Sequence, residues 1–309
     1  MQNKHDSRDR NVSASLFFAL SSRKLLNWVP DRPYLSAMWR AYFHQRLDWK
    51  NPRSFNEKIQ WLKAKDHNPL YPTLVDKFAV RQFIENTIGD RYLIPLVGGP
   101  WNSFDEIDFD RLPRQFVLKC THDSGGVVIC RDKGALDLDA ARQKIEKSLR
   151  RNYYWGGREW PYQNIPPRII AEAYMADGSD DELRDYKFYM FGGTARCILV
   201  CTNRSAKSKM HMTFFSPDWK RLPFERQYAN DPRELPKPER FEEMLLLAEQ
   251  LSADLPFARI DLYETDHKVY FGEITLHPAS GLGKFQPVEW DYRLGEWIDL
   301  HKYFPKEFE

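Results

Sequence analysis

The chain has 309 residues, of which 42% are hydrophobic, and carries 46 Lys and Arg against 44 Asp and Glu. A chain of this length forms one large or two medium domains and buries a sizeable core without covalent staples. The balanced charge gives no reason to expect a nucleic-acid partner, and no apolar run reaches the roughly 18 residues of a membrane span. Four cysteines without C-x-x-C spacing or paired histidines argue against a zinc site or disulfides and indicate a reducing compartment.

Positive charge is concentrated in the first 65 residues, which carry 13 Lys and Arg but only 5 Asp and Glu. The apolar stretch from Leu16 to Leu20 is too short for a signal peptide and is followed by Arg23 and Lys24. We therefore predict a cytoplasmic protein. The basic segment 1–65 suits peripheral contact with the inner face of a membrane, although a solvated helical face is the simpler interpretation.

The N-terminal part of the chain has a helical pattern. Residues 1–70 are predicted to be helical and rich in aromatic side chains, and Ser54 with Glu57 has the form of a capping box. A further helix is predicted over residues 73–88, where Gly89 ends it.

The pattern then changes to short strands mixed with helices. The predicted strands and helices are a hairpin of 116–120 and 127–130, a helix over 138–149 entered through Asp137, a strand over 168–172, a hairpin of 185–191 and 195–200, a helix over 241–251 and a hairpin of 257–263 and 269–275. Hairpins mixed with helices predict an α+β fold rather than a parallel doubly wound sheet.

The last hairpin carries the most informative polar residues. The period of a strand places Arg259 and Asp261 on one face, and a turn near Asp266 would bring Glu273 opposite Asp261. Two facing carboxylates repel each other unless a cation lies between them. Mg²⁺ favours one or two carboxylates together with substrate phosphates. Spacing alone leaves two interpretations open, a Mg²⁺ site and an ion pair with Arg259 on a solvated face.

Lysines mark two further candidate positions. Lys119 ends an apolar strand and precedes a glycine-containing turn, an arrangement that can neutralise phosphates while backbone N–H groups approach closely. An exposed lysine before an ordinary turn is the alternative, and Asp76 with Lys77 can equally be a surface pair. The sequence has no P-loop, dinucleotide, zincin or α/β-hydrolase motif.

The order of these features resembles the ATP-grasp superfamily. The segments that carry this resemblance are Asp76-Lys-Phe-Ala-Val-Arg81, Ile94-Pro95, Phe116-Val-Leu-Lys119 with its glycine turn, Ile169-Ile-Ala-Glu-Ala-Tyr-Met175, Arg259-x-Asp261 and Glu273-x-Thr275. More narrowly, the chain is similar to the TupA-like ATP-grasp family of bacterial teichuronopeptide, capsule and surface-polysaccharide biosynthesis. That similarity is carried by Phe55-Asn-Glu-Lys-Ile-Gln-Trp-Leu62, Leu93-Ile-Pro-Leu96, Asp185-Tyr-Lys-Phe188 and Glu289-Trp-Asp291.

The resemblance implies an ATP-grasp fold that holds a nucleotide between two α+β subdomains. These would be residues 71–172 and 173–309, preceded by a basic helical region of residues 1–70. Lys77 and Lys119 would contact the phosphates, under a flexible loop formed by Ser124, Gly125 and Gly126. Adenine would be read by Glu172, Ala173, Tyr174 and Met175.

The resemblance also implies the reacting groups. Asp261 and Glu273 would bind Mg²⁺, Arg259 would steady the charge of an acyl phosphate, and Lys187 would add a phosphate contact. Thr275 stands where many family members have Asn, and a hydroxyl is a poorer metal ligand.

The function that we expect is an ATP- and Mg²⁺-dependent carboxylate–amine ligase acting on a uronic acid or sugar of a bacterial surface polysaccharide. One alternative is a glycosyltransferase of capsule or O-antigen biosynthesis, for which Asp108-Phe-Asp110 and Asp137-Leu-Asp139 offer D-x-D triplets. Another is an inactive nucleotide-binding assembly protein. The aromatic residues between Tyr153 and Tyr162 suit stacking on a sugar ring and equally suit a buried loop cluster.

Overall fold

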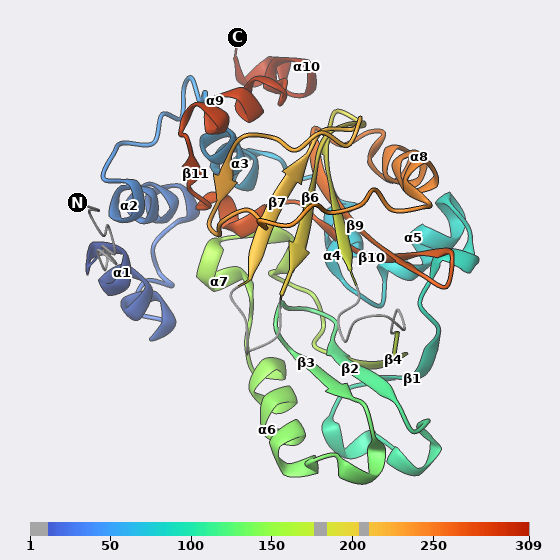
Figure 1. The fold of residues 1–309 in the computed structure, drawn as a ribbon. Helices are drawn as coiled ribbons and strands as arrows, with labels where there is room; N and C mark the ends of the chain where they lie inside the picture. Colours follow the sequence, from blue (N-terminus) through green and yellow to red (C-terminus); the bar gives the residue numbers. More distant parts are fainter. Residues whose placement is uncertain (1–11, 176–183, 204–209, 309) are drawn as a thin grey trace, which may run out of the picture.

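The computed structural model describes residues 12–175, 184–203 and 210–308, which contain two main antiparallel sheets with helices packed on them (Figure 1). The smaller sheet has the order β1-β4-β2-β3, formed by β1 (Leu96–Trp101), β2 (Phe116–Cys120), β3 (Val127–Cys130) and β4 (Ile169–Ala173). The larger sheet has the order β10-β9-β5-β6-β7, formed by β5 (Asp185–Phe191), β6 (Thr194–Thr202), β7 (His211–Phe215), β9 (Phe257–Thr265) and β10 (Lys268–Thr275). This is the predicted α+β class.

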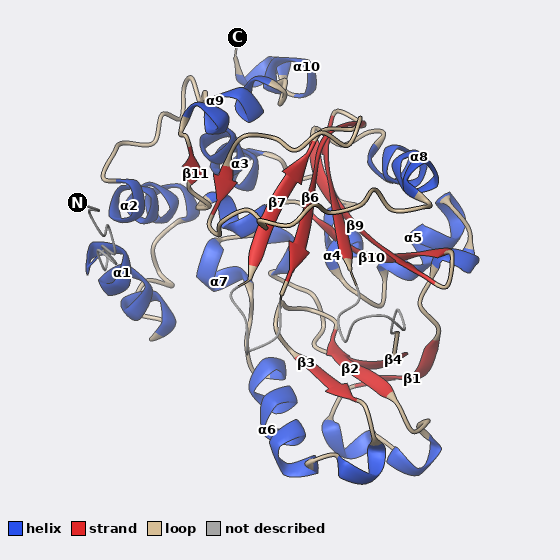
Figure 2. Cartoon of the chain, viewed as in Figure 1, coloured by secondary structure: helices blue, strands red, loops and turns tan. Residues whose placement is uncertain are grey.

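Helix α6 (Leu138–Leu149) covers one face of the smaller sheet (Figure 2). Phe116 and Leu118 alternate toward this face and are fully buried against Ile145. Lys119 follows Leu118 directly in the strand and therefore points to the opposite face. Asp137 caps α6 by accepting a hydrogen bond from the backbone N–H of Ala140, as predicted.

Helices cover both faces of the larger sheet. On one face, α4 (Tyr71–Val75), α5 (Val80–Thr87) and α8 (Phe241–Ser252) share a core with Phe188 and Ile260. On the other, α3 (Phe55–Lys65) and α9 (Glu289–Glu296) pack against Phe257. We predicted residues 71–92 to belong to the first subdomain, whereas their apolar side chains contribute to the core of the larger sheet.

The predicted helix over residues 73–88 is two helices, α4 and α5. The Asp76 carboxylate accepts hydrogen bonds from the backbone N–H groups of Phe78 and Ala79, at 2.8 and 3.2 Å. Such local side-chain bonds compete with helical ones. The Lys77 backbone N–H donates to the Thr121 carbonyl of the smaller sheet's turn, at 3.1 Å. The break therefore places Lys77 between the two sheets.

The N-terminal helices α1 (Val12–Ser22) and α2 (Asp31–Phe43) pack on each other beside α7 (Tyr154–Gly157). The capping box of α3 is present, since Ser54 and Glu57 bond reciprocally. The remaining elements are α10 (Leu300–Tyr303) and a short sheet of β8 (Glu225–Arg226) and β11 (Phe285–Gln286). Within the described ranges, the helices are too short or too polar to cross a bilayer.

Candidate active site

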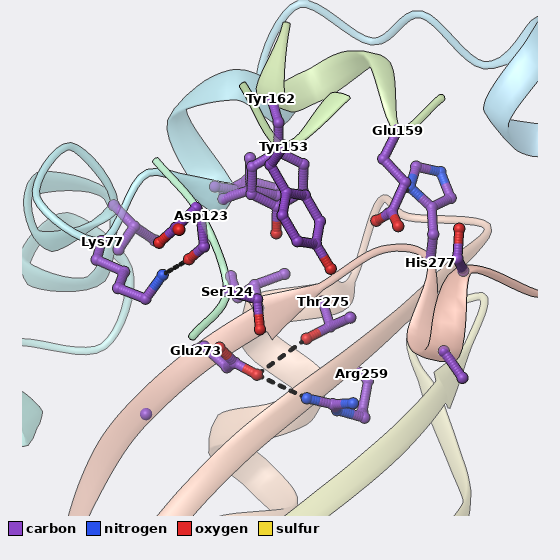
Figure 3. Close-up of a pocket in the computed structure, with 17 residues that line it drawn as sticks. Lys77, Asp123, Ser124, Tyr153, Glu159, Tyr162, Arg259, Glu273, Thr275 and His277 are labelled. Atoms are coloured by element: carbon purple, nitrogen blue, oxygen red, sulfur yellow. Dashed lines mark hydrogen bonds and ion pairs between the residues drawn. The ribbon is translucent and has the colours of Figure 1, made fainter. Parts of the chain in front are cut away.

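A cavity of about 290 Å³ lies where the larger sheet meets the turn of the smaller sheet and the break between α4 and α5 (Figure 3). Its walls come from five separate segments of the chain, namely 74–80, 123–124, 153–162, Arg259 and 272–280. The polar residues and tyrosines that line it are Lys77, Asp123, Ser124, Tyr153, Glu159, Tyr162, Arg259, Glu273, Thr275, His277 and Ser280.

The larger sheet brings its predicted polar residues together. Asp261 is paired in register with Glu273 on β10 and with Lys187 on β5, so the three adjacent strands present them side by side. Arg259 lies between the carboxylates: its Nε is 2.6 Å from Asp261 Oδ1, and its Nη2 is 2.7 Å from Glu273 Oε1. Lys187 donates to Asp261 and to Asp185. The facing carboxylates are therefore neutralised by the protein's own cations.

The two carboxylates differ in their surroundings. Asp261 is 1% exposed, and burial raises its pKa while Arg259 and Lys187 oppose the rise. The Glu273 side chain is 44% exposed and faces the cavity. Burial works against its ionisation, but Arg259, Lys187 and Lys77 outweigh burial and lower the pKa of Glu273 to about 2. Burial likewise disfavours the charge of Lys187, yet Asp185 and Asp261 raise its pKa to about 12.

These contacts decide how the pair fits a divalent cation. Glu273 fits, because it faces the cavity as an ionised carboxylate. Both oxygens of Asp261 are bonded to Arg259, so this residue can ligate a metal only where Arg259 releases one of them. Across the described part of the chain, no three His, Cys, Asp or Glu residues gather into a ready-made metal cluster. One or two carboxylates suffice for Mg²⁺ when phosphates supply the other ligands.

Lys77 lies in the break between α4 and α5 and lines the cavity across from the larger sheet. Its ammonium donates to the backbone carbonyl of Asp123, and burial lowers its pKa while Glu273 and Asp123 oppose the change. The Asp123 carboxylate is buried, accepts a hydrogen bond from Ser148 through Oδ2, and leaves Oδ1 without a partner. Ser148 thus holds the Asp123 side chain, while the Asp123 backbone carbonyl holds Lys77.

The glycine turn has structural reasons for its sequence. Ser124 lines the cavity. Gly125 has φ +103°, a conformation that other residues rarely adopt. A Cβ on Gly126 would lie 2.1 Å from the Ser148 hydroxyl, so close packing requires glycine there. Contact of this turn with phosphates remains a prediction.

Lys119 and Glu172 pair with each other and are not among the residues that line the cavity. Lys119 Nζ lies 2.5 Å from Glu172 Oε2, and Arg81 lies 3.6 Å from Oε1 of the same carboxylate. The Ala173 backbone N–H is bonded to the Pro95 carbonyl at 2.9 Å. Contact of residues 172–175 with adenine remains a prediction.

The aromatic segment divides into two parts. Tyr153 and Tyr162 line the cavity with ring centroids 4.8 Å apart. Tyr154 and Trp155 instead surround the buried Arg158 guanidinium together with Tyr34 of α2. The first part is available to a ligand, and the second is a buried cluster that attaches the N-terminal helices.

Several cavity residues were not predicted as site residues. They are Asp123, Glu159 and His277. The strand period that places Glu273 and Thr275 on one face continues to His277 and could have indicated it. The D-x-D aspartates have capping roles: Asp108 accepts from the N–H of Asp110, and Asp137 caps α6.

Comparison with solved structures finds ATP-grasp ligases of low sequence identity. The chain is similar to D-alanine–D-alanine ligase from Bacillus anthracis complexed with ATP, with 18% identity, a TM-score of 0.41 and coverage of 73% of this chain and 65% of that one. It is similar to the D-alanine–D-alanine ligase from Helicobacter pylori, with 14% identity, a TM-score of 0.40 and coverage of 87% and 68%. The chain thus spans 65–68% of the length of these ligases. No curated protein matches it.

Residues 57–299 match a family of ATP-grasp proteins, which confirms the predicted ATP-grasp fold. The two sheets are thus those of an ATP-grasp fold, and the polar cavity lies where they meet. More narrowly, the chain belongs to the TupA-like ATP-grasp family.

Proposed function

We propose that the chain is an ATP- and Mg²⁺-dependent carboxylate–amine ligase that works through an acyl phosphate. The observation that carries this proposal is the cavity itself, which gathers Lys77, Arg259 and Glu273 around one space. Phosphoryl transfer needs little covalent help from a protein, because positioning and charge neutralisation supply most of the rate. A cavity that places two cations beside a carboxylate able to bind a metal suits this chemistry.

The residues act in two steps. In the first, a substrate carboxylate oxygen attacks the terminal phosphorus of ATP, and ADP leaves with the electrons of the broken bond. Lys77 and Lys119 bind the phosphates, and Arg259 stabilises the charge on the acyl phosphate. Lys187 adds a phosphate contact only where Asp185 or Asp261 releases it, because both carboxylates bind its ammonium. In the second, an amine attacks the acyl carbon, phosphate leaves with the C–O bond electrons, and the nitrogen loses its surplus protons.

Glu273 and Asp261 hold the metal in this proposal. Bound Mg²⁺ supplies further neutralisation of the phosphate oxygens. Arg259 bonds both carboxylates, so its guanidinium fixes them relative to each other. Glu172 to Met175, together with the turn of Ser124, Gly125 and Gly126, form the nucleotide-binding rim.

The finer substrate assignment is a hexuronate or sugar of a surface polysaccharide, which takes up an amine as an amide. Tyr153 and Tyr162 support it, because aromatic faces with a hydroxyl suit a sugar ring. The test incubates the protein, ATP and Mg²⁺ with glucuronate or galacturonate and a pool of amines. Mass spectrometry should find a condensed product with one ADP per product. A glycan extended from a nucleotide sugar without ATP consumption would establish the glycosyltransferase instead.

We also propose that the protein works in the cytoplasm at the inner face of the membrane. Leu16, Leu25 and Trp28 are 60%, 55% and 81% exposed near the exposed cations Arg23 and Lys24. Residues 12–30 contain no Asp or Glu. Exposed Trp and Leu beside basic residues suit an anionic lipid surface.

Vesicle co-sedimentation tests this contact. The chain should bind vesicles that contain phosphatidylglycerol and not vesicles of phosphatidylcholine alone. Trp28→Ala should weaken binding severalfold, and Lys24→Ala by about fivefold, since each basic residue contributes ~1 kcal/mol. Leu246→Ala is the matched control, because Leu246 is 59% exposed on α8. Equal binding to both vesicle types would contradict this proposal and favour a basic segment that is simply exposed to solvent.

A further inference from the structure

The end of the cavity away from Lys77 is lined by a buried carboxylate and a buried imidazole (Figure 3). The Glu159 and His277 side chains are 6% and 3% exposed, and Glu159 Oε2 lies 3.7 Å from His277 Nδ1. This separation is longer than a hydrogen bond. A buried carboxylate of this kind is costly unless a cation or strong donors satisfy it.

This pair lies close to the groups that handle the acyl phosphate. Thr275 of β10 is paired in register with Arg259 of β9. His277 is two residues farther along the chain, or about 7 Å in an extended strand. Glu159 comes from the segment that also places Tyr153 and Tyr162 in the cavity wall. A small group held by the pair would thus lie beside Arg259, on the side away from Lys77.

The two ends of the cavity differ in their charged groups, since Lys77 and Arg259 lie with Asp123 and Glu273 at one end, and Glu159 lies with His277 at the other. Lys77 and Arg259 favour the anionic phosphates and carboxylate. Glu159 favours a cation, and a neutral His277 adds a hydrogen-bond acceptor. We propose that Glu159 and His277 bind the amine substrate in its ammonium form, an inference that rests on the proposed ligase function.

The wall around this pair is held rigidly by α3. The Lys63 ammonium, buried in the wall, donates to the Gly157 carbonyl and to the Ser280 carbonyl and hydroxyl, at 2.8 to 3.0 Å. Ala279 and Ser280 both have φ +52°, a strained conformation of the kind that clusters at binding sites. A Cβ on Gly157 would lie 2.9 Å from Glu159 Oε1, so glycine makes room for the carboxylate.

Glu159 also interacts with the charge of Lys63. Its alternative role is therefore structural, namely to neutralise the buried Lys63 ammonium. Burial lowers the pKa of Lys63 to about 8, and Glu159 opposes this change. The experiment must therefore separate ligand binding from neutralisation of Lys63.

The experiment measures the Tm of the full chain with Mg²⁺ and a non-hydrolysable ATP analogue, with and without an amine. The change in Tm separates amine binding from neutralisation of Lys63. The probes are glucosamine against N-acetylglucosamine, and ethanolamine against ethylene glycol, so that each pair differs in the ammonium group. The wild type should be stabilised by both amines and by neither uncharged partner. Glu159→Gln should weaken the amine response at least about tenfold, and His277→Gln should weaken it severalfold.

The matched control is the exposed pair of Glu239 and His267, which lie 2.7 Å apart with side chains 65% and 79% exposed. Glu239→Gln and His267→Gln should respond to amines as the wild type does. An unchanged amine response in Glu159→Gln, even with a lower Tm, would assign Glu159 to Lys63 and overturn the inference. A wild type that ignores both amines would overturn it too. Failure of the proposed function is a separate result, because the nucleotide analogue would then give no shift.

Discussion

The two sheets hold their cationic side chains in different ways. On the larger sheet, Arg259 and Lys187 are bonded to Asp261 and Glu273 across three adjacent strands. On the smaller sheet, Lys119 is paired with Glu172 at 2.5 Å, outside the residues that line the cavity. Both arrangements are present without a ligand, but Arg259 joins two carboxylates, whereas Lys119 is held by Glu172, with which phosphates would compete in the proposed function. Variants of the larger sheet should therefore change the chemical step, and variants of the smaller sheet should change nucleotide binding.

Arg259→Met should have the largest effect. It leaves Asp261 buried with Lys187 as its remaining cation, and breaking a buried ion pair typically costs about 3–5 kcal/mol. Loss of a donor at the developing charge lowers kcat by about 10²- to 10³-fold. ADP release at saturating ATP and thermal unfolding measure the two effects. Arg259→Lys keeps the charge without the two-pronged geometry and should be intermediate. A normal kcat with a lower Tm would leave Arg259 a structural role only.

Lys119→Ala tests the smaller sheet. The kcat/KM for ATP should fall about a hundredfold with the fold intact, because an ammonium that opposes several phosphate charges is lost. If the contrast between the sheets is right, a higher KM for ATP accounts for most of this fall. Lys77→Ala should also weaken ATP binding, since Lys77 lines the cavity. The exposed Lys144→Ala on α6 is the control. Near-normal activity of Lys119→Ala would remove Lys119 from the site.

Glu273→Gln and Asp261→Asn address the metal. Each should raise the Mg²⁺ concentration needed for half-maximal ADP release, because amides bind hard cations more weakly than carboxylates. Glu273→Gln should have the larger effect, since Glu273 faces the cavity and Asp261 is occupied by Arg259. An unchanged Mg²⁺ dependence with reduced thermal stability in both variants would show that the pair serves to anchor Arg259.

Acid titration gives a second readout for Glu273. Its pKa is lowered to about 2 in the folded protein, so the folded state holds its proton less tightly than the unfolded chain. The resulting stabilisation is present above the ordinary glutamate pKa and is lost as pH falls toward 2. The difference in unfolding free energy between wild type and Glu273→Gln should therefore shrink across this range. A difference independent of pH would contradict the lowered pKa.

The sequence predicted those features that depend on local pattern. The hairpin that pairs Asp261 with Glu273 follows from strand period and a turn near Asp266, and both are confirmed. The break at Asp76 was not predicted; the Asp76 side chain bonds locally to Phe78 and Ala79, but the bond from Lys77 to Thr121 joins distant segments. The approach of Glu159 to His277 likewise joins distant segments through tertiary packing. Local periodicity contains no information about such contacts.

Helix caps give the smallest expected effects and compare the sheets directly. Ser54 accepts from the Glu57 N–H at 3.2 Å on α3 of the larger sheet, and Asp137 accepts from the Ala140 N–H at 2.9 Å on α6 of the smaller one. Alanine at either position should cost about 1 kcal/mol. Because the cores of the two sheets are separate clusters, native-state hydrogen exchange should locate each loss in its own sheet. KM should not change in Ser54→Ala, since Phe55 and Ile59 still anchor α3 in the core. An equal loss of protection in both sheets would mean that they unfold as one unit. The Arg259 and Lys119 ion pairs would then open with the same unfolding free energy.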